Sequence, residues 1–489
     1  MLLTIWNDLF VYNPHNPTFF TNPIFWLYFG LILVVYQFLH SKAFARNLFI
    51  FLFSLFFYYK SSGLYLVILL FSIVLDYFVA LKIASITDKQ AKKIWLIASI
   101  SANLGLLVYF KYTNFILENI FWLFESKFEK LDIFLPIGIS FYTFQTISYV
   151  VDVYNNKIKP CTNFLDYAFY MAFFPHLVAG PIVRARDFLP QVYVDYQLSQ
   201  RDFGHAIFLV INGLTKKILI SDYIAYNFVD RVFEAPERYS GFENLMACYG
   251  YAIQIYCDFS GYTDIAIGVA LLLGFRLCTN FDSPYKSVDI TEFWRRWHIS
   301  LSSWLRDYLY IPLGGNRKGK VRTYINLMLT MLLGGLWHGA HIKFIIWGGL
   351  HGLALAVHKF YMDWRGTKGT QSKGFERIVW LTLTFHFVCF CWIFFRATDM
   401  QIVQRMLYQI AFAFNGDKMF EIIAGYHEVF SLMLIAYLIH WLPKKLKNEV
   451  EDFFIAIPDF AKAVVVALVI IGLYQASTAA MQPFIYFQF

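Results

Sequence analysis

Apolar runs long enough to cross a lipid bilayer recur along almost the whole chain, and they limit its fold more than any other feature. A membrane helix needs about 20 mostly apolar residues, because no water inside the bilayer can hydrogen-bond to its backbone. Several runs are short or contain Gly and Pro, which is typical of tilted or re-entrant segments, so we expect about 11 to 13 membrane helices. The candidate spans fall near 23–40, 47–59, 63–82, 94–110, 133–151, 163–180, 205–221, 243–257, 262–277, 322–340, 342–361, 376–396, 426–443 and 459–478.

The composition of the chain supports a membrane protein. Of the 489 residues, 58% are hydrophobic and 15% are charged, whereas about a quarter of the residues in soluble domains are charged. The net charge of +8 comes from short basic clusters between apolar runs, which is typical of loops that set membrane orientation and not of a nucleic-acid-binding face. No internal repeat or long linker divides the sequence. We therefore expect an all-α polytopic integral membrane protein, embedded in membrane lipids, with a single domain over residues 1–489.

The segment 280–320 differs from the apolar runs because it is both polar and rich in aromatic residues. It reads NFDSPYKSVDITEFWRRWHISLSSWLRDYLYIPLGGNRKGK. Trp and Tyr together with Arg favour the membrane–water interface. We expect this segment to form re-entrant or interfacial helices that dip into the protein.

His338 lies at the end of an apolar run, in the sequence LLGGLWHGAH, and an ionisable residue in such a place is a candidate functional site. The neighbouring Gly334, Gly335 and Gly339 remove bulk, so that another helix or a thin ligand chain could approach the backbone. A histidine can accept a proton from a hydroxyl near neutral pH. A structural histidine, held by a hydrogen bond within a helix bundle, fits the local sequence equally well.

His298 is the second candidate and lies in FWRRWHISLSSWLRDYLY. Arg295 and Arg296 precede it and could bind the phosphates of an acyl donor, and Ser302 follows one turn later. An interfacial helix whose arginine pair reaches the lipid headgroups is the better interpretation of the local sequence alone.

Two aspartates, Asp258 and Asp264, lie in the run YCDFSGYTDIAIG between two candidate spans. Asp258 fits either a polar patch that lines a cavity and orients a histidine, or, like Ser260, a cap on the following helix. For Asp264 a break between two helices is the better interpretation.

Metal binding has little support in the sequence. His338 and His341 share one helical face, but no carboxylate lies nearby, and two histidines do not make a site. None of the six cysteines has zinc-ligand spacing. We expect no metal and no bound cofactor, and we interpret His351 and His358 as packing or interface residues.

Several long motifs together closely resemble the membrane-bound O-acyltransferase family, in the bacterial branch that acetylates alginate or peptidoglycan and D-alanylates teichoic acid. They are LPIGISFYTFQTISYVVDVY, FFPHLVAGPIVRARDFLPQ, NGLTKKILISD, YCDFSGYTDIAIG, SPYKSVDITEFWRRWHISLSSWLRDYLYIPLGGNRKG and GGLWHG. The resemblance implies a ring of helices around a thin centre crossed by a transmembrane tunnel. It also implies that His338 is catalytic and that His298 is the second family histidine. The residues expected to line the donor site or tunnel are Trp337, Gly339, Arg295, Arg296, Ser302 and Asp258.

The C-terminal residues 484–489 read FIYFQF. They resemble the F-x-Y-x-x-F tail of a small partner protein of the teichoic-acid D-alanylation acyltransferase, which is proposed to receive the acyl group on its tyrosine. This resemblance makes Tyr486 a candidate acyl acceptor, because a tyrosine hydroxyl is a nucleophile once a base removes its proton. An aromatic anchor at the membrane edge is the alternative interpretation.

The resemblance implies an enzyme of the bacterial inner membrane that moves an acetyl group from acetyl-CoA to an extracytoplasmic polysaccharide. We expect peptidoglycan as that polysaccharide and an extracytoplasmic SGNH-type O-acetyltransferase as partner. The alternatives are alginate or another exopolysaccharide, and a lipid- or protein-directed acyltransferase of the same fold. A transporter with a histidine proton path is more distant, because transporters often contain repeated halves.

Overall fold

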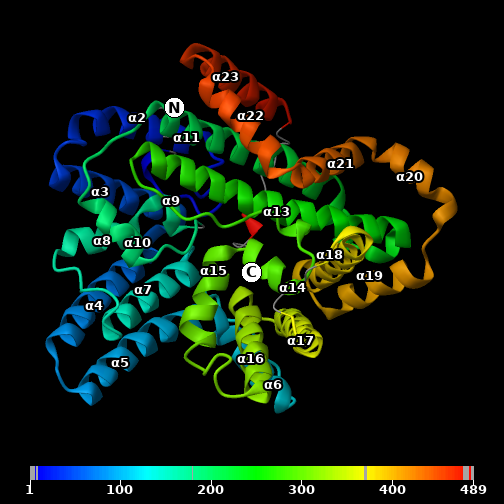
Figure 1. The fold of residues 1–489 in the computed structure, drawn as a ribbon, viewed down its shortest axis with the longest axis horizontal. Helices are drawn as coiled ribbons and strands as arrows, with labels where there is room; N and C mark the ends of the chain where they lie inside the picture. The colour runs from blue at the N-terminus through cyan, green and yellow to red at the C-terminus, as the bar shows by residue number, and fades with distance from the viewer. Residues whose placement is uncertain (1–5, 7–8, 179, 368–371, 477–483, 486–489) are drawn as a thin grey trace. The chain divides into compact units, whose positions relative to one another are not determined.

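The computed structural model describes residues 6, 9–178, 180–367, 372–476 and 484–485, and these residues form helices, turns and loops without any strand (Figure 1). The predicted all-helical fold is thereby confirmed. Tyr486 lies outside the described residues. The chain divides into two compact units, one of Met1–Ala206 with Ala266–Cys278 and the other of Ile207–Ile265 with Thr279–Phe489. The single domain, and the helical ring with its tunnel, stay predictions.

Helices of very different lengths make up each unit. Those that lie in the first unit are α2 (Pro23–Leu39), α3 (Ala43–Ser62), η1 (Gly63–Tyr65), α4 (Leu66–Ser85), α5 (Lys89–Leu107), η2 (Val108–Tyr112), α6 (Thr113–Leu123), α7 (Ile139–Tyr154), α8 (Phe164–Ala172), α9 (Phe174–Leu177) and α10 (Ala185–Val192). Two helices, α11 (Gln200–Leu214) and α13 (Gly241–Leu272), contribute to both units.

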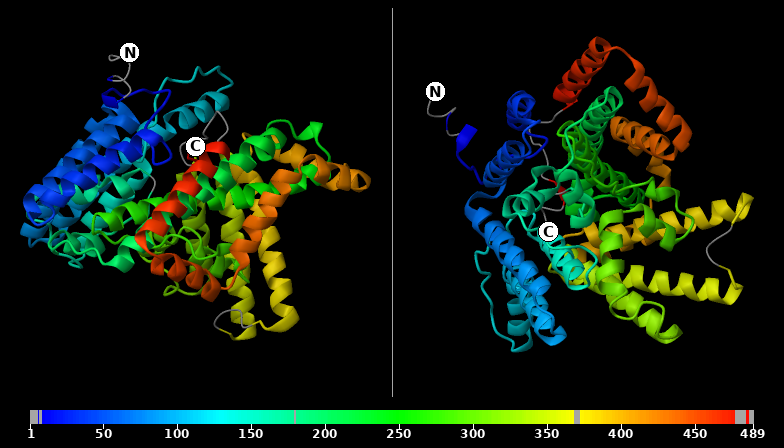
Figure 2. Two further views of the ribbon diagram at one scale, coloured as in Figure 1. Left: turned by 90° about the horizontal axis from the view of Figure 1, so that it is seen from above. Right: turned by 60° about the vertical axis from the view of Figure 1, so that its left-hand side comes forward.

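The second unit contains all the predicted site residues. Its other helices are η3 (Thr215–Asp222), η4 (Ala225–Val229), α12 (Asp230–Glu234), η5 (Pro236–Arg238), η6 (Pro284–Lys286), α14 (Ile290–Arg296), α15 (Ile299–Leu305), η7 (Arg306–Tyr310), α16 (Lys320–His338), α17 (Ile342–Arg365), α18 (Gly374–Arg396), α19 (Met400–Phe412), η8 (Gly416–Lys418), α20 (Met419–Gly425), α21 (His427–Trp441), α22 (Lys444–Ala456) and α23 (Asp459–Ala476). Among them, α17 and α18 lie side by side, in yellow in Figure 2.

Six helical runs among the described residues are long and apolar enough to cross a membrane, or up to seven if a bent pair of helices counts as one span. This number is lower than the 11 to 13 expected. The expected spans 47–59 and 63–82 fall within one helical run, Ala43–Ser85. Other expected spans, such as 163–180, break into short helices. Polar residues also lower the mean hydropathy of α16 and α17, which fail the same test.

Helix α13 corrects one prediction from the sequence. The helix break favoured for Asp264 was wrong, and the cap considered for Asp258 is absent, because α13 continues unbroken for 32 residues through both aspartates. The charges are tolerated inside the helix because lysines on the neighbouring η3 segment pair with them: Lys217 with Asp258 at 2.5 Å and Lys216 with Asp264 at 2.7 Å. A buried carboxylate that is paired needs no solvent, so it does not have to end a helix.

Close backbone packing brings these partners together. A Cβ atom at Gly261 of α13 would lie 2.7 Å from the carbonyl oxygen of Gly213, and one at Gly213 would lie 2.4 Å from the oxygen of Gly261. Only glycine allows two helices to approach this closely. The YCDFSGYTDIAIG motif therefore provides one of the two contact surfaces of a tightly packed helix pair.

The segment 280–320 forms the short helices η6, α14, α15 and η7. Helix α14 begins where the Asp289 side chain accepts a hydrogen bond of 2.7 Å from the backbone N–H of Glu292. Its aromatic side chains are buried, notably Phe293 and Trp297. The position of these helices at a membrane surface stays a prediction.

Candidate active site

His338 is the last residue of α16, and the pairing of α16 with α17 fixes its position. A Cβ atom at Gly335 would lie 2.2 Å from the carbonyl oxygen of Phe344, and one at Gly348 would lie 2.2 Å from that of Met331. The space beside Gly335 is therefore filled by a neighbouring helix, one of the two explanations that the sequence allowed. This contact lies one helical turn before His338.

Aromatic rings enclose the imidazole of His338. Its ring centroid lies 4.9 Å from that of Trp337, 5.0 Å from that of Trp347 and 5.2 Å from that of Phe395. The residue is 4% exposed. Few water molecules can reach such a ring, so an acyl group held beside it would be protected from hydrolysis.

His298, which is fully buried, is held by hydrogen bonds instead. Its Nδ1 atom lies 3.1 Å from Oδ1 of Asn280, an oxygen that also accepts hydrogen bonds from the backbone N–H and the hydroxyl of Ser300. The backbone donor identifies that atom of Asn280 as the oxygen, so Nδ1 of His298 must be the donor and Nε2 carries the lone pair. Burial lowers the pKa of His298 to about 3, so the ring is neutral at physiological pH.

The backbone at His298 is strained. It has a φ of +42°, in the left-handed region that side chains other than glycine rarely adopt. Such strain persists only when the surroundings impose it, and it is common at active sites. Here the backbone N–H of Ile299 donates to the carbonyl oxygen of Asn280 at 2.9 Å, so Asn280 holds both the ring and the backbone beside it.

One aromatic cluster connects the two histidines, although 40 residues of sequence separate them. The ring centroid of Trp337, next to His338 in the chain, lies 6.4 Å from that of His298. On its other side, the His298 ring lies 4.6 Å from that of Phe259 on α13. The structure thus brings both predicted histidines into one aromatic cluster.

The remaining predicted site residues differ in their exposure and in their bonding partners. Arg296 pairs with the Glu292 carboxylate at 2.8 Å, and Arg295 is exposed; their binding of donor phosphates stays a prediction. Ser302 donates a hydrogen bond of 3.1 Å to the carbonyl oxygen of Trp297. A Cβ atom at Gly339 would collide with the ring of Phe344 at 2.0 Å, so this glycine makes room for a side chain of the protein.

Asp258 belongs to a buried ion cluster that reasoning from the sequence missed. Lys217 lies 2.5 Å from Oδ1 of Asp258 and 2.7 Å from Oδ1 of Asp222. The second oxygen of Asp258 accepts a hydrogen bond of 3.0 Å from the backbone N–H of Ile485, at the C-terminal end of the described chain. Ionisable residues four or five positions apart inside one apolar run, such as Lys217 and Asp222, were the available signal.

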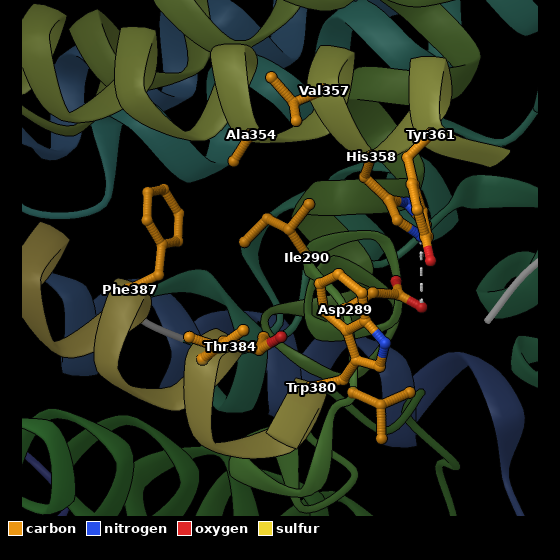
Figure 3. Close-up of a pocket in the computed structure, with 11 residues that line it drawn as sticks. Asp289, Ile290, Ala354, Val357, His358, Tyr361, Trp380, Thr384 and Phe387 are labelled. Carbon is orange, nitrogen blue, oxygen red and sulfur yellow. Dashed lines mark ion pairs between the residues drawn. The ribbon is translucent and has the colours of Figure 1, made fainter. Parts of the chain in front are cut away.

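The three other histidines considered from the sequence contact different neighbours. His341 caps α17 by accepting from the N–H of Lys343 at 3.2 Å, and His351 packs against Trp347. Figure 3 shows His358 and Asp289 facing each other, 3.6 Å apart, at one end of an apolar hollow of about 360 Å³ between α17 and α18. Within the described parts of the chain, no three His, Cys, Asp or Glu residues are placed to hold a metal ion.

Comparisons with known proteins match these motifs to one family. A sequence model of the membrane-bound O-acyltransferase family, MBOAT, matches residues 18–404. A peptidoglycan O-acetyltransferase of Helicobacter pylori is 40% identical over 423 residues, which cover 78% of this chain and 80% of the relative. A probable alginate O-acetylase of Pseudomonas syringae is 40% identical over 409 residues, 82% of this chain and 77% of the relative. A teichoic acid D-alanyltransferase of Bacillus subtilis is 29% identical over 266 residues, 52% of this chain and 67% of the relative.

Proposed function

Because this chain belongs to the membrane-bound O-acyltransferase family and is a multi-pass membrane acyltransferase, we propose that it carries an acetyl group across the bacterial inner membrane. The donor is a cytoplasmic thioester, acetyl-CoA, and the final acceptor is an extracytoplasmic polysaccharide. CoA is too large and too charged to cross lipid, whereas the acetyl group is small. The observation that carries the proposal is the position of His338 and His298 in one buried aromatic cluster.

His338 acts as the general base in this proposal. It removes the proton from the acceptor hydroxyl, whose oxygen attacks the thioester carbonyl and forms a tetrahedral intermediate. The C–O bond stays, the C–S bond breaks, and the proton on His338 passes to the departing thiolate sulfur. The rings of Trp337, Trp347 and Phe395 keep out the water that would hydrolyse the thioester.

His298 has a positioning role in this reaction. With its proton fixed on Nδ1 by Asn280, the ring presents Nε2 as an acceptor. We propose that Nε2 accepts hydrogen bonds from the amide N–H groups of the donor's pantetheine arm. His298 would thereby hold that arm in line with His338. The exposed Arg295 is the remaining candidate for the phosphates of CoA.

Tyr486 is the proposed first acceptor of the acetyl group. Support comes from Phe484, one of the two described residues before it. The ring of Phe484 lies 5.4 Å from that of Phe259, which itself contacts His298. An acetylated Tyr486 would then pass its acetyl group to an extracytoplasmic SGNH-type transferase. That partner would place it on the polysaccharide.

Peptidoglycan is the proposed polysaccharide, and alginate or another exopolysaccharide is the second candidate. The relatives named for peptidoglycan and for alginate are equally similar to this chain, at 40% identity. Mass spectrometry of cell-wall and secreted sugars, with and without the gene, distinguishes the two. Peptidoglycan acetyl groups that persist without the gene would exclude the first candidate.

The test of the enzyme is transfer of labelled acetyl groups by purified protein in lipid vesicles. We expect transfer from acetyl-CoA, and its loss in His338→Ala with normal membrane insertion. The matched control is His386→Ala, which removes an exposed histidine of the same unit. Normal turnover by a well-inserted His338→Ala protein would overturn the mechanism. Vesicles that show neither transfer nor acetyl-CoA hydrolysis would favour the transporter or a different acyl donor.

A further inference from the structure

The buried ion cluster formed by Asp222, Lys217 and Asp258 has an unbalanced charge. One ammonium group faces two carboxylates, and all three side chains are at most 9% exposed. A buried carboxylate without enough hydrogen-bond donors is costly. The cluster therefore needs further donors, and the described chain shows where one of them comes from.

That donor is the backbone of the C-terminal segment. The N–H of Ile485 donates to Oδ2 of Asp258 at 3.0 Å, so Asp258 uses one oxygen for Lys217 and the other for the tail. Ile485 is itself buried. A hydrogen bond from a neutral N–H to a carboxylate is among the strong ones. In Figure 1 the red C-terminal segment lies beside α13, in agreement with this contact.

Aromatic contacts hold the residue before Ile485 in the same place. The ring centroid of Phe484 lies 4.8 Å from that of Tyr262 and 5.4 Å from that of Phe259. Tyr262 follows Asp258 by four residues, so the two side chains lie on one face of α13. That face therefore offers a charged acceptor and an aromatic surface one turn apart.

A second oxygen of the cluster is still available. Within the described residues, the buried Oδ2 of Asp222 has no hydrogen-bond partner. Buried carboxylate oxygens in this position are nearly always satisfied. The site can thus accept one donor more than Ile485 supplies.

The geometry points to a docking site for the chain's own C-terminal segment, built from the Asp222–Lys217–Asp258 cluster and the aromatic face of α13. Asp258 is its positioning residue and recognises the backbone of Ile485 whatever the side chain there. This bond fixes Ile485, the residue that immediately precedes Tyr486 in the sequence. The docking stands on the contacts alone, but its consequence for acetyl transfer rests on the proposed function.

Digestion of the purified full-length protein by carboxypeptidase tests the docking. Ile485→Pro removes the one N–H that Asp258 binds and changes nothing in the helices. We expect its C-terminal residues to be released about tenfold faster or more, because a charge-assisted hydrogen bond is lost. The matched control is Ile485→Val, which keeps the N–H and a branched apolar side chain, and whose digestion should follow the wild type.

A second pair of variants approaches the same bond from the cluster. Asp258→Ala leaves Lys217 paired with Asp222 and should expose the tail as Ile485→Pro does. Asp264→Ala removes another carboxylate of α13, which is paired with Lys216 instead of Lys217, and should leave digestion slow. Equal digestion of wild type, Ile485→Pro and Asp258→Ala would overturn the docking site.

Acetyl transfer, measured on the same samples, separates the two ideas. A tail that is released in Ile485→Pro together with a fall in transfer supports both. A released tail with unchanged transfer keeps the docking site and contradicts the acceptor role of Tyr486. A tail digested equally in all variants contradicts the docking site whatever happens to transfer.

Discussion

The two histidines of the site are both buried, but their surroundings differ. Three aromatic rings surround His338, and the close backbone packing of α16 against α17 fixes its position. His298 is fastened by a hydrogen bond from Nδ1 to Asn280 and by a strained backbone. The bond to Asn280 defines one tautomer of the His298 ring. The difference suits a base beside a positioning group.

The strongest way to break this comparison is to replace each histidine by glutamine. We expect His338→Gln to lose roughly a thousandfold in acetyl transfer, within the range for general bases, while the melting temperature changes little. His298→Gln should also unfold earlier, by about 1–3 kcal/mol, because it loses the bond to Asn280 at a strained φ. Labelled transfer and thermal unfolding in detergent measure both. A greater loss of stability in His338→Gln would reverse the assignment of roles.

Asn280→Asp sharpens the comparison by changing the hydrogen-bond partner of His298 while both histidines stay in place. The new carboxylate would favour the protonated ring and raise the pKa of His298. Transfer should then fall toward acidic pH, roughly tenfold at pH 6 if that pKa reaches 7. Ser300→Ala removes a neighbouring donor to the same oxygen without adding charge, and its pH profile should match the wild type. Identical profiles for all three proteins would mean that Asn280 does not control the protonation of His298.

The support of His338 by backbone packing can be tested with two glycines of α17. Gly348→Ala would place a Cβ atom 2.2 Å from the Met331 carbonyl oxygen, whereas Gly349→Ala meets only a leucine methyl at 3.5 Å. The first change should cost about 1–3 kcal/mol of stability, as overpacking does, and lower transfer severalfold by shifting His338. The second should change neither. Similar melting temperatures for both variants would show that the helix pair relaxes without strain.

The smallest effect concerns stability at acidic pH. The pKa of His298 is about 3 in the folded protein and 6.5 in the unfolded chain, so the unfolded state binds more protons between these values. Stability from this group is complete above pH 6.5 and decreases as the pH falls, by about 1.4 kcal/mol for each pH unit. The His298→Gln protein should lack that part of the slope. Parallel curves of unfolding free energy between pH 6.5 and 5 would contradict the burial of a neutral ring.

Two kinds of feature could be predicted from the sequence: the apolar runs that recur along it, and residues that belong to a motif. Apolar runs gave the all-helical membrane fold, and the WHG and WRRWHISLS motifs identified His338 and His298. The partners Asn280 and Lys217 were missed, because they are brought close by packing between segments distant in sequence. A glycine beside a histidine gives the same sequence pattern whether a ligand or a neighbouring helix fills the space that it leaves.

The error at α13 has the same origin. Two aspartates within an apolar run indicated a break, since an unpaired charge in lipid is costly. The lysines that neutralise them lie 41 and 48 residues earlier, and nothing local to α13 reveals the pairing. The number of spans was overestimated for a related reason, because apolarity alone does not reveal which runs bend, break or join.

The paired charges of α13 also constrain how the protein is made. Asp258 and Asp264 would each add about 2.5–3.5 kcal/mol to the insertion of this helix as a lone segment. Lys216 and Lys217 precede α13 and leave the ribosome before it, so their segment is available when α13 reaches the membrane. The lysine segment and α13 should therefore pair first and move from the translocon into the lipid together. A nascent chain that lacks both lysines should retain α13 at the translocon.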